Sequence, residues 1–429
     1  MDTFSSVAKF STLRIFLAYV AYLDWGLHHV DVVAAYLHGP LDEEIYMTIP
    51  EGVENSGSGH YWKLKKALYG LKQAGRQWKK RLHEVLIKFG FICAFADDCL
   101  YIKRHEGNIT LLILVYVDDI AIAGPDGYYI ISFKSFLGKD FEITNLGELK
   151  HMLGVLVTRD CLRHLIYLNQ LAYIQCTITC FGLENSTPSP TTEAEKRAFE
   201  DYAGDIHYLS LVGSLLFATQ TRLDIQFAVG LVAQFSNNPG IAHLEAAKRI
   251  LCYLKSTIDY NLVLGKREEG KFDLVGWSDS NWAQDCDDRR STSGFVFDVA
   301  GSSISWSSKK QATIATSSVK AEYVASANAT KEAIWLCTLL TELDFSPAMA
   351  TTIYADNQGC IVLANNPVSH SRAKHIDIRH HFIRERIECR EIKLNYISTK
   401  DMLADVFTKA LPRETFEKFR NLLGVLPSD

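Results

Sequence analysis

The stretch LLILVYVDDIAIAG, residues 111–124, decides how the rest of the chain is interpreted. Its apolar residues run from Leu111 to Val117 and again from Ile120 to Gly124, which predicts two buried strands joined by a tight turn. The adjacent carboxylates Asp118 and Asp119 lie at this turn, where hairpins usually carry Asn-Gly or Asp-Gly. Two like charges cost stability there unless a cation holds them. A solvated hairpin tip explains such a pair about as well as a metal site, so the neighbouring segments must decide.

The composition is that of an ordinary globular protein, with 48% hydrophobic and 22% charged residues among 429. This length predicts about two or three domains. The sequence lacks both the apolar window of a membrane span and the pattern of a signal peptide, so we expect an intracellular protein, not secreted and without a membrane partner. The ten cysteines show no CxxC pair, which argues against a zinc site or a disulfide framework and predicts mostly buried thiols.

A basic segment stands out against the net charge of −5. Residues 61–90, YWKLKKALYGLKQAGRQWKKRLHEVLIKFG, interleave aromatic residues with Lys and Arg. Lysines can neutralise phosphates and aromatic rings can stack on bases, so the segment could bind nucleic acid. The alternative is a helix with a solvated basic face, and the segment alone favours that alternative.

Other acids and histidines lie in ambiguous contexts. Asp31 is inside a strand-like run from Val30 to Ala35, where burying an ion is costly, and the local evidence favours a capped or paired carboxylate. We interpret Asp97 and Asp98 as turn residues because they precede a strand-like run without joining two. The pair His28 and His29 is more typical of a surface than of a metal site.

From residue 271 the pattern becomes rich in strands. Strand-like segments alternate with helical ones, which predicts a mixed sheet with helices on its faces and with strand ends and helix starts at one edge. Four acids then become candidate neighbours: Asp279, Glu322, Asp356 and Asp405. For each acid alone a helix cap or a salt bridge is the better explanation, whereas four clustered acids are unfavourable without cations.

The order of the segments resembles one family. DVVAAYLHG, YGLKQAGRQW, YVDD and LGELKHMLGV follow one another, and TRLDIQFAVG and the segments after it match too. The chain resembles the reverse transcriptase and ribonuclease H region of the Pol polyprotein of copia-type LTR retrotransposons. The resemblance implies a mixed α+β and α/β fold with three parts: a reverse transcriptase palm-like domain over residues 1–185, a helical connection over 186–268 and a ribonuclease H-like mixed-sheet domain over 269–429.

The resemblance also implies roles for single residues. Two Mg²⁺ ions per active site are expected. Their ligands, which are also the catalytic residues, would be Asp31, Asp118 and Asp119 in the palm, and Asp279, Glu322, Asp356 and Asp405 in ribonuclease H. Tyr36 would exclude a 2′-hydroxyl and Gln73 would lie under the incoming nucleotide. The residues in contact with nucleic acid would be Lys72, Arg76, Trp78, Lys79, Leu153 and Gly154, the last two in a primer grip.

The implied activities are RNA-directed DNA polymerase and ribonuclease H. Their partners would be an RNA template, a DNA primer, an RNA/DNA hybrid and deoxynucleoside triphosphates, in cytoplasmic virus-like particles, with the nucleus as a second location. The start, MDTFSSVAKF, resembles an interior segment of the family, so we expect the upstream fingers region to be absent and polymerisation to be weak. The alternative function is a decayed or domesticated fragment that binds nucleic acid without turnover.

Some positions depart from the family pattern or stay ambiguous. Gly75 and Leu223 stand where the family usually has Pro, Val33 where it often has Lys, and Lys320 where it usually has an acid. A histidine cluster fits a hybrid-contacting helix and a solvated face equally well; its members are His370, His375, His380 and His381.

Overall fold

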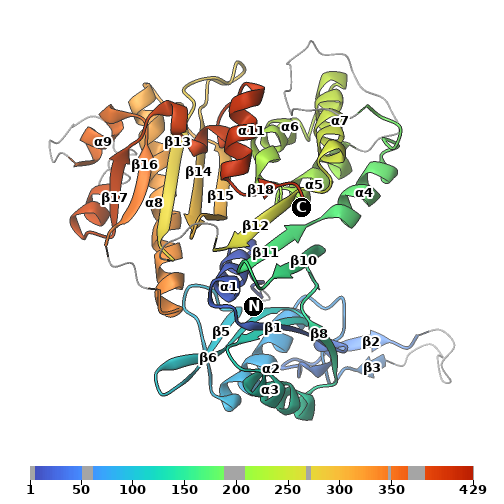
Figure 1. Cartoon of the computed structure of the whole chain (residues 1–429). Helices are drawn as coiled ribbons and strands as arrows, with labels where there is room; N and C mark the ends of the chain where they lie inside the picture. Colours follow the sequence, from blue (N-terminus) through green and yellow to red (C-terminus); the bar gives the residue numbers. More distant parts are fainter. Residues whose placement is uncertain are drawn as a thin grey trace. The chain divides into compact units, whose positions relative to one another are not determined.

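The computed structural model describes residues 5–50, 61–187, 208–266, 272–345, 349–365 and 382–428 (Figure 1). The chain divides into two compact units, Met1–Phe16 with Leu23–Lys150, and Leu17–Tyr22 with His151–Asp429. No helix in the described ranges is long and apolar enough to cross a membrane. The four histidines between 370 and 381 lie outside the described residues.

The first unit is built on a six-stranded antiparallel sheet in the order β4-β5-β6-β7-β1-β8. Its strands are β1 (Gly26–Val32), β4 (Phe91–Cys93), β5 (Leu100–His105), β6 (Asn108–Tyr116), β7 (Asp119–Gly124) and β8 (Ile143–Glu148). Strands β6 and β7 form the predicted hairpin. Nearly every residue of both strands is buried, which explains why their sequences are continuously apolar instead of alternating.

Helices α2 (Ala74–Phe89) and α3 (Gly127–Asp140) complete the core of this unit. Helix α2 carries most of the basic segment. It buries Trp78, Leu82 and Leu86 against the sheet and leaves its basic residues toward solvent, as expected for an amphipathic helix. It ends at Gly90, whose φ of 97° gives the left-handed C-cap that a residue without a Cβ adopts without strain.

Smaller elements of the first unit are helix α1 (Phe10–Leu23), which continues into the second unit, the turn η1 (Ala35–His38), and a two-stranded sheet of β2 (Tyr46–Thr48) and β3 (Tyr61–Lys63). Helix α1 forms where the apolar spacing of residues 1–23 predicts a helix. Its last turns belong to the second unit, where Tyr19 and Tyr22 pack on Phe272 and Phe345.

The second unit contains a five-stranded sheet in the order β18-β12-β11-β10-β9. Its strands are β9 (His151–Met152), β10 (Val155–Asp160), β11 (Leu165–Asn169), β12 (Asn261–Gly265) and β18 (Val425–Leu426). The helices associated with this part of the chain are α4 (Leu171–Cys180), α5 (Tyr208–Ala218), η2 (Leu223–Ile225), α6 (Gln226–Ala233) and α7 (Ile241–Ser256). The sheet joins three distant segments of the chain. The three-part division at residues 185 and 268 therefore stays a prediction, while the contacts divide the chain after Lys150.

A buried ion pair fixes the helical part of the second unit. Arg222 donates to both carboxylate oxygens of Asp224, at 3.1 and 2.7 Å, and to the carbonyl of Thr257 at 2.9 Å. The Tyr253 hydroxyl donates to Asp224 at 2.7 Å. Leu223, a departure from the family pattern, is buried between the two charged residues, so this apolar side chain is accommodated without disturbing the pair.

The other sheet of this unit has the order β15-β14-β13-β16-β17. Its strands are β13 (Leu274–Ser280), β14 (Thr292–Val299), β15 (Ser302–Lys310), β16 (Thr351–Ala355) and β17 (Ile392–Tyr396). Strands β13 to β15 are antiparallel, turning at Ala300 and Gly301 as predicted, and β16 and β17 run parallel to β13. This arrangement confirms the predicted mixed sheet.

Helix α8 (Ser318–Glu342) packs on β13 and β14, and α9 (Gln358–Asn365) lies against α8 (Figure 1). The helix predicted around residues 401–409 is instead two 3₁₀ turns, η3 (Thr399–Asp401) and η4 (Leu403–Phe407), followed by α11 (Arg413–Leu422). The segment LNYISTKDMLADVFTKAL predicts a strand and then a helix with Asp401 as its N-cap, and this prediction is wrong because Asp401 lies in η3. The reason is a tertiary contact: the buried turn η4 packs its Phe407 closely over Gly294 of β14.

All ten cysteines lie in the described ranges and are free thiols there. The prediction that most of them are buried is wrong, because Cys99 and Cys360 alone are classed as buried and five are exposed. Composition predicts the average burial of cysteine but not the face of a helix or turn on which a given cysteine lies.

Candidate catalytic centres

Strand register brings the three predicted palm acids together. Strands β1 and β7 pair so that Asp31 lies opposite Asp119. The backbone N–H of Val32 donates to the carbonyl of Asp118 at 3.0 Å. Between the strands of the hairpin, Val117 has a φ of 58°, a left-handed conformation that a β-branched residue adopts only when its surroundings enforce it.

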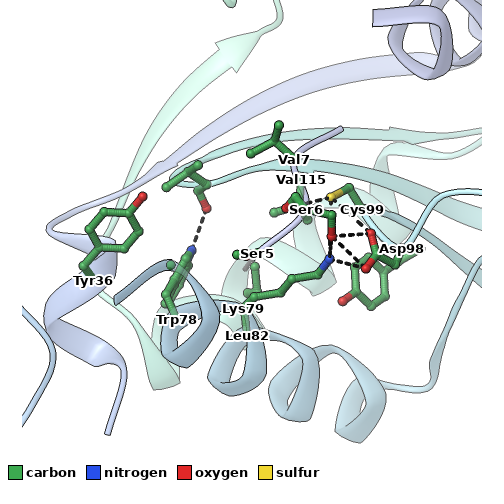
Figure 2. A pocket seen from close by; sticks show the side chains of 13 residues that line it. Ser5, Ser6, Val7, Tyr36, Trp78, Lys79, Leu82, Asp98, Cys99 and Val115 are labelled. Atoms are coloured by element: carbon green, nitrogen blue, oxygen red, sulfur yellow. Dashed lines mark hydrogen bonds and ion pairs between the residues drawn. The ribbon is translucent and has the colours of Figure 1, made fainter. Parts of the chain in front are cut away.

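Trp78 helps to hold Val117 in this backbone conformation. Its indole Nε1–H donates to the carbonyl of Val117 at 2.7 Å, and its ring packs on Phe141. Trp78 is 2% exposed, so we assign it to packing beneath the turn and not to stacking on nucleic acid. Figure 2 shows it reaching from α2 toward the hairpin, beside a cavity of about 90 Å³ that Tyr36 and Val115 also line.

Charge and burial distinguish the three palm acids. Burial, and after it the charges of Asp118 and Asp119, raise the pKa of Asp31, although His29 acts in the opposite direction. The Nε2 atom of His29 lies 2.9 Å from Asp119 Oδ1. The interpretation of His29 as a surface residue is wrong: it is 7% exposed. Residues 29 and 31 of one strand share a face, but the burial of His29 also requires the pairing of β1 with β7.

The residues predicted to bind nucleotide and nucleic acid occupy different environments. Tyr36 lies in η1 with its ring centroid 4.7 Å from that of Tyr69, and Gln73 precedes the first turn of α2. Lys72 and Arg76 are exposed. Leu153 and Gly154 form the tip of the β9–β10 hairpin, both with positive φ, and lie in the second unit.

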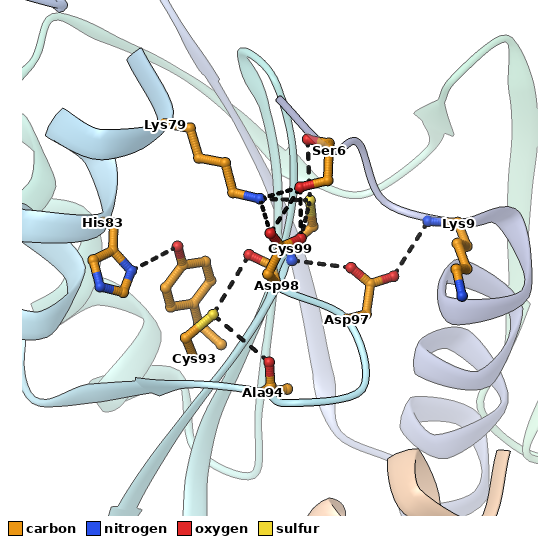
Figure 3. Close-up of polar contacts among 10 residues, drawn as sticks. Ser6, Lys9, Lys79, His83, Cys93, Ala94, Asp97, Asp98 and Cys99 are labelled. Atoms are coloured by element: carbon orange, nitrogen blue, oxygen red, sulfur yellow. Dashed lines mark hydrogen bonds and ion pairs between the residues drawn. The ribbon is translucent and has the colours of Figure 1, made fainter. Parts of the chain in front are cut away.

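Lys79 and the acidic pair Asp97–Asp98 form a structural cluster (Figure 3). Lys79 pairs with Asp98 at 2.5 Å, and the Ser6 hydroxyl donates to the same carboxylate at 2.7 Å. Asp97 is buried and accepts from the hydroxyl of Thr12 in α1 at 2.5 Å. The two acids do lie in the turn between β4 and β5, as predicted, and in addition they tie the N-terminal segment and α1 to that turn.

The second centre collects four acids from four elements. Asp279 lies near the end of β13, Asp356 directly follows the parallel strand β16, Glu322 is near the start of α8 and Asp405 is in η4. Parallel pairing of β13 with β16 places their carboxyl ends at one edge. One carboxylate oxygen from each of Asp279, Glu322 and Asp356 lies within 4.8 Å of the others. In the described residues the palm acids do not converge as closely.

Burial shapes the electrostatics of the second centre. It raises the pKa of Glu322 to about 10, with further contributions from Asp279 and Asp356. Burial and then Asp279 raise the pKa of Asp405 to about 7, and burial also raises that of Asp279. Burial would lower the pKa of Lys409, but Asp279 and Asp405 outweigh it and the pKa is raised. The centre therefore disfavours the charge of its own acids.

Three hydrogen bonds orient these carboxylates. The Thr408 hydroxyl donates to Asp279, that of Thr399 to Asp356 at 2.7 Å, and the backbone N–H of Ser280 to Glu322 Oε1 at 3.3 Å. Sequence reasoning missed both threonines, although Thr408 lies only three residues after Asp405. Each of these donors holds one oxygen of its carboxylate.

The residues fit a hard divalent cation. Glu322 is 5% exposed, and its Oε2 is buried with no hydrogen-bond partner among the described residues. A buried carboxylate oxygen without a donor is costly unless a cation binds it. Carboxylate oxygens are the ligands that Mg²⁺ prefers. Asp279, Glu322, Asp356 and Asp405 could hold it together.

The departures from the family pattern leave these acids unchanged. Gly75 is the second residue of α2, Val33 is exposed after β1, and Lys320 lies in the first turn of α8, where its Nζ donates to the Thr316 hydroxyl at 2.8 Å. These positions are at helix starts or on the surface, and none of them is one of the seven candidate metal ligands.

Comparison with known proteins identifies the family of this chain. Residues 1–194 match the family described as reverse transcriptase (RNA-dependent DNA polymerase). The retrovirus-related Pol polyprotein from transposon TNT 1-94 of Nicotiana tabacum is 38% identical over 99% of this chain and 33% of its own length. That from transposon RE1 of Arabidopsis thaliana is 37% identical over 99% of this chain and 29% of its own. The chain thus spans about a third of the length of these relatives.

Two further matches cover their own chains almost fully. A transposon Ty5-1 protein of Saccharomyces cerevisiae is 32% identical over 71% of this chain and 100% of its own. Among solved structures, LC11-RNase H1, isolated from compost, covers 34% of this chain and 97% of its own with 16% identity and a TM-score of 0.25. The transposon relatives, among them the yeast protein that this chain covers in full, show that the chain belongs to the Pol polyproteins of copia-type LTR retrotransposons.

Proposed function

We propose that this chain carries out RNA-directed DNA synthesis and cleavage of the RNA strand in RNA/DNA hybrids, both by two-Mg²⁺ phosphoryl transfer. The observation that carries the ribonuclease assignment is the convergence of Asp279, Glu322 and Asp356 within 4.8 Å, with Oε2 of Glu322 buried and without a hydrogen-bond partner in the described part of the chain. Clustering four carboxylates destabilises the folded protein by charge repulsion, so we attribute the cluster to function.

The chain's own contribution to hydrolysis is positioning. Thr408, Thr399 and the Ser280 N–H fix the carboxylates of Asp279, Asp356 and Glu322 before any ligand arrives. Ligands that are already fixed need no reorganisation when charge develops on the phosphate. Such positioning and electrostatic stabilisation are the main source of catalysis in phosphoryl transfer. When bound, Mg²⁺ would make water a better nucleophile and neutralise the leaving 3′-oxygen.

The proposed substrates follow from the two centres. The ribonuclease would take an RNA/DNA hybrid. A protein recognises such a hybrid because one strand carries 2′-hydroxyls and the other strand lacks them. The palm would take an RNA template, a DNA primer and deoxynucleoside triphosphates. We place this work in the cytoplasm, in virus-like particles, with the nucleus as a second location, by analogy with transposon Pol proteins.

Hybrid cleavage tests the ribonuclease assignment. With an end-labelled RNA strand annealed to DNA, the wild type should cut the RNA in Mg²⁺ and leave the same RNA intact when it is single-stranded. Asp356→Asn should remove most cleavage. Asp401→Asn, a matched change of an exposed acid in η3, should leave it unchanged. Equal cleavage by wild type and Asp356→Asn would contradict the assignment.

The palm supports a second candidate function, nucleic-acid binding without synthesis. The observation that favours it is the contact of His29 with Asp119 at 2.9 Å, together with the looser grouping of the palm acids. Primer extension decides between the two. If the palm is active, the wild type extends a primer on RNA and Asp118→Asn does not. If the protein retains template–primer in a binding assay but gives no extension, the binding function is favoured.

A further inference from the structure

Lys409 lies among the four acids of the ribonuclease centre. It follows Asp405 by four residues, and its Nζ is 2.8 Å from Asp405 Oδ1 and 3.8 Å from Asp279 Oδ2. The side chains of Asp405 and Asp279 are 6% and 3% exposed, whereas that of Lys409 is 29% exposed. The ammonium therefore reaches both buried carboxylates from the solvent side.

A divalent cation needs the same oxygens. Mg²⁺ binds carboxylate oxygens at about 2.0–2.1 Å and demands near-octahedral geometry. An ammonium 2.8 Å from Asp405 Oδ1 would lie within a few ångström of such an ion, where like charges repel strongly at low effective dielectric. The ammonium and a cation shared by Asp279 and Asp405 therefore exclude each other.

We infer that Lys409 is an internal competitor of the metal: it pairs with Asp279 and Asp405 when no metal is bound, and swings toward solvent when Mg²⁺ enters. This inference rests on the proposed ribonuclease function. The flexible four-carbon stem of lysine and the partial exposure of Lys409 permit the movement. Lys409 is thus a positioning residue that sets the Mg²⁺ concentration at which the centre is filled.

Calorimetric titration of the metal-free full chain with MgCl₂ tests the inference. Lys409→Met removes the ammonium while keeping the apolar stem, so the Kd for Mg²⁺ should fall roughly tenfold, a change of about 1.4 kcal/mol. Lys409→Arg retains a cation and should show no such gain. Lys400→Met removes an exposed lysine in the neighbouring turn η3 and should bind Mg²⁺ as the wild type does.

The outcomes separate this inference from the proposed function. Equal Kd values for the wild type and Lys409→Met overturn the competition and leave the ribonuclease assignment standing. Absence of Mg²⁺ binding in both proteins overturns the two together. Thermal unfolding gives an independent readout: in EDTA, Lys409→Met should melt below the wild type because Asp279 and Asp405 lose their counter-ion, and Mg²⁺ should raise its midpoint more. An unchanged midpoint in EDTA contradicts the pairing.

Discussion

Replacing Glu322 with Gln should stabilise the metal-free protein, and the gain should grow with pH. Burial, then Asp279 and Asp356, raise the pKa of Glu322 from 4.5 to about 10. Below pH 4.5 the carboxyl is protonated in both the folded and the unfolded protein, so it does not reduce the unfolding free energy there. As pH rises toward the folded pKa, folding must take up a proton and that stability is lost.

The magnitude follows from the same two pKa values. Each pH unit between 4.5 and about 10 costs the wild type about 1.4 kcal/mol of unfolding free energy. At about pH 7.5, three units above the unfolded pKa, the cost reaches about 4 kcal/mol. Gln needs no proton and keeps an oxygen for the N–H of Ser280, so it should recover up to that amount.

Urea unfolding in EDTA at about pH 5 and about pH 8 measures the effect. The stability difference between Glu322→Gln and the wild type should be small at the lower pH and rise by about 1.4 kcal/mol per unit. Glu388→Gln, which changes an exposed glutamate, should show no such trend. A variant less stable than the wild type at both pH values, or a gain independent of pH, would refute the reasoning.

Three other substitutions test separate parts of the structure. Asp224→Asn should lower the unfolding free energy by about 3–5 kcal/mol in urea titration, because it leaves the buried Arg222 without its counter-charge; a loss below about 1 kcal/mol would argue against that pairing. Trp78→Phe should cost about 1–2 kcal/mol and speed amide hydrogen exchange around Val117, whereas unchanged exchange would mean that the indole bond does not hold the turn. Gly294→Ala should weaken Mg²⁺ binding in calorimetry, because a Cβ would lie 2.7 Å from Phe407 Cβ and displace η4; wild-type affinity would show that η4 adjusts.

Much of the fold was predictable from local pattern. The continuous apolar runs around Asp118 and Asp119 predicted the hairpin, and the turn at Ala300 and Gly301 followed from its sequence. Strand ends and helix starts also placed Asp279, Glu322 and Asp356 together, because topology brings such positions to one edge of a sheet.

The rest depends on contacts that no local pattern encodes. The pairing of β12 with β18 joins segments more than a hundred residues apart. The burial of His29 depends on the register between β1 and β7, and the 3₁₀ turn η4 that carries Asp405 packs closely over Gly294. The sequence does not single out Lys409, because only the fold places its ammonium beside both Asp279 and Asp405.

The short strand β18 limits how segments of two related chains can be combined. Transposons recombine, and a crossover between residues 272 and 424 would join the β12 of one parent to the β18 of another. The two strands meet through backbone pairs, Leu262 with Val425 and Asn261 with Leu426, and through the Ser428 hydroxyl that Asn261 Nδ2 contacts at 2.9 Å. A chimaeric chain should therefore keep this edge of the sheet only when its two parents match at these few residues.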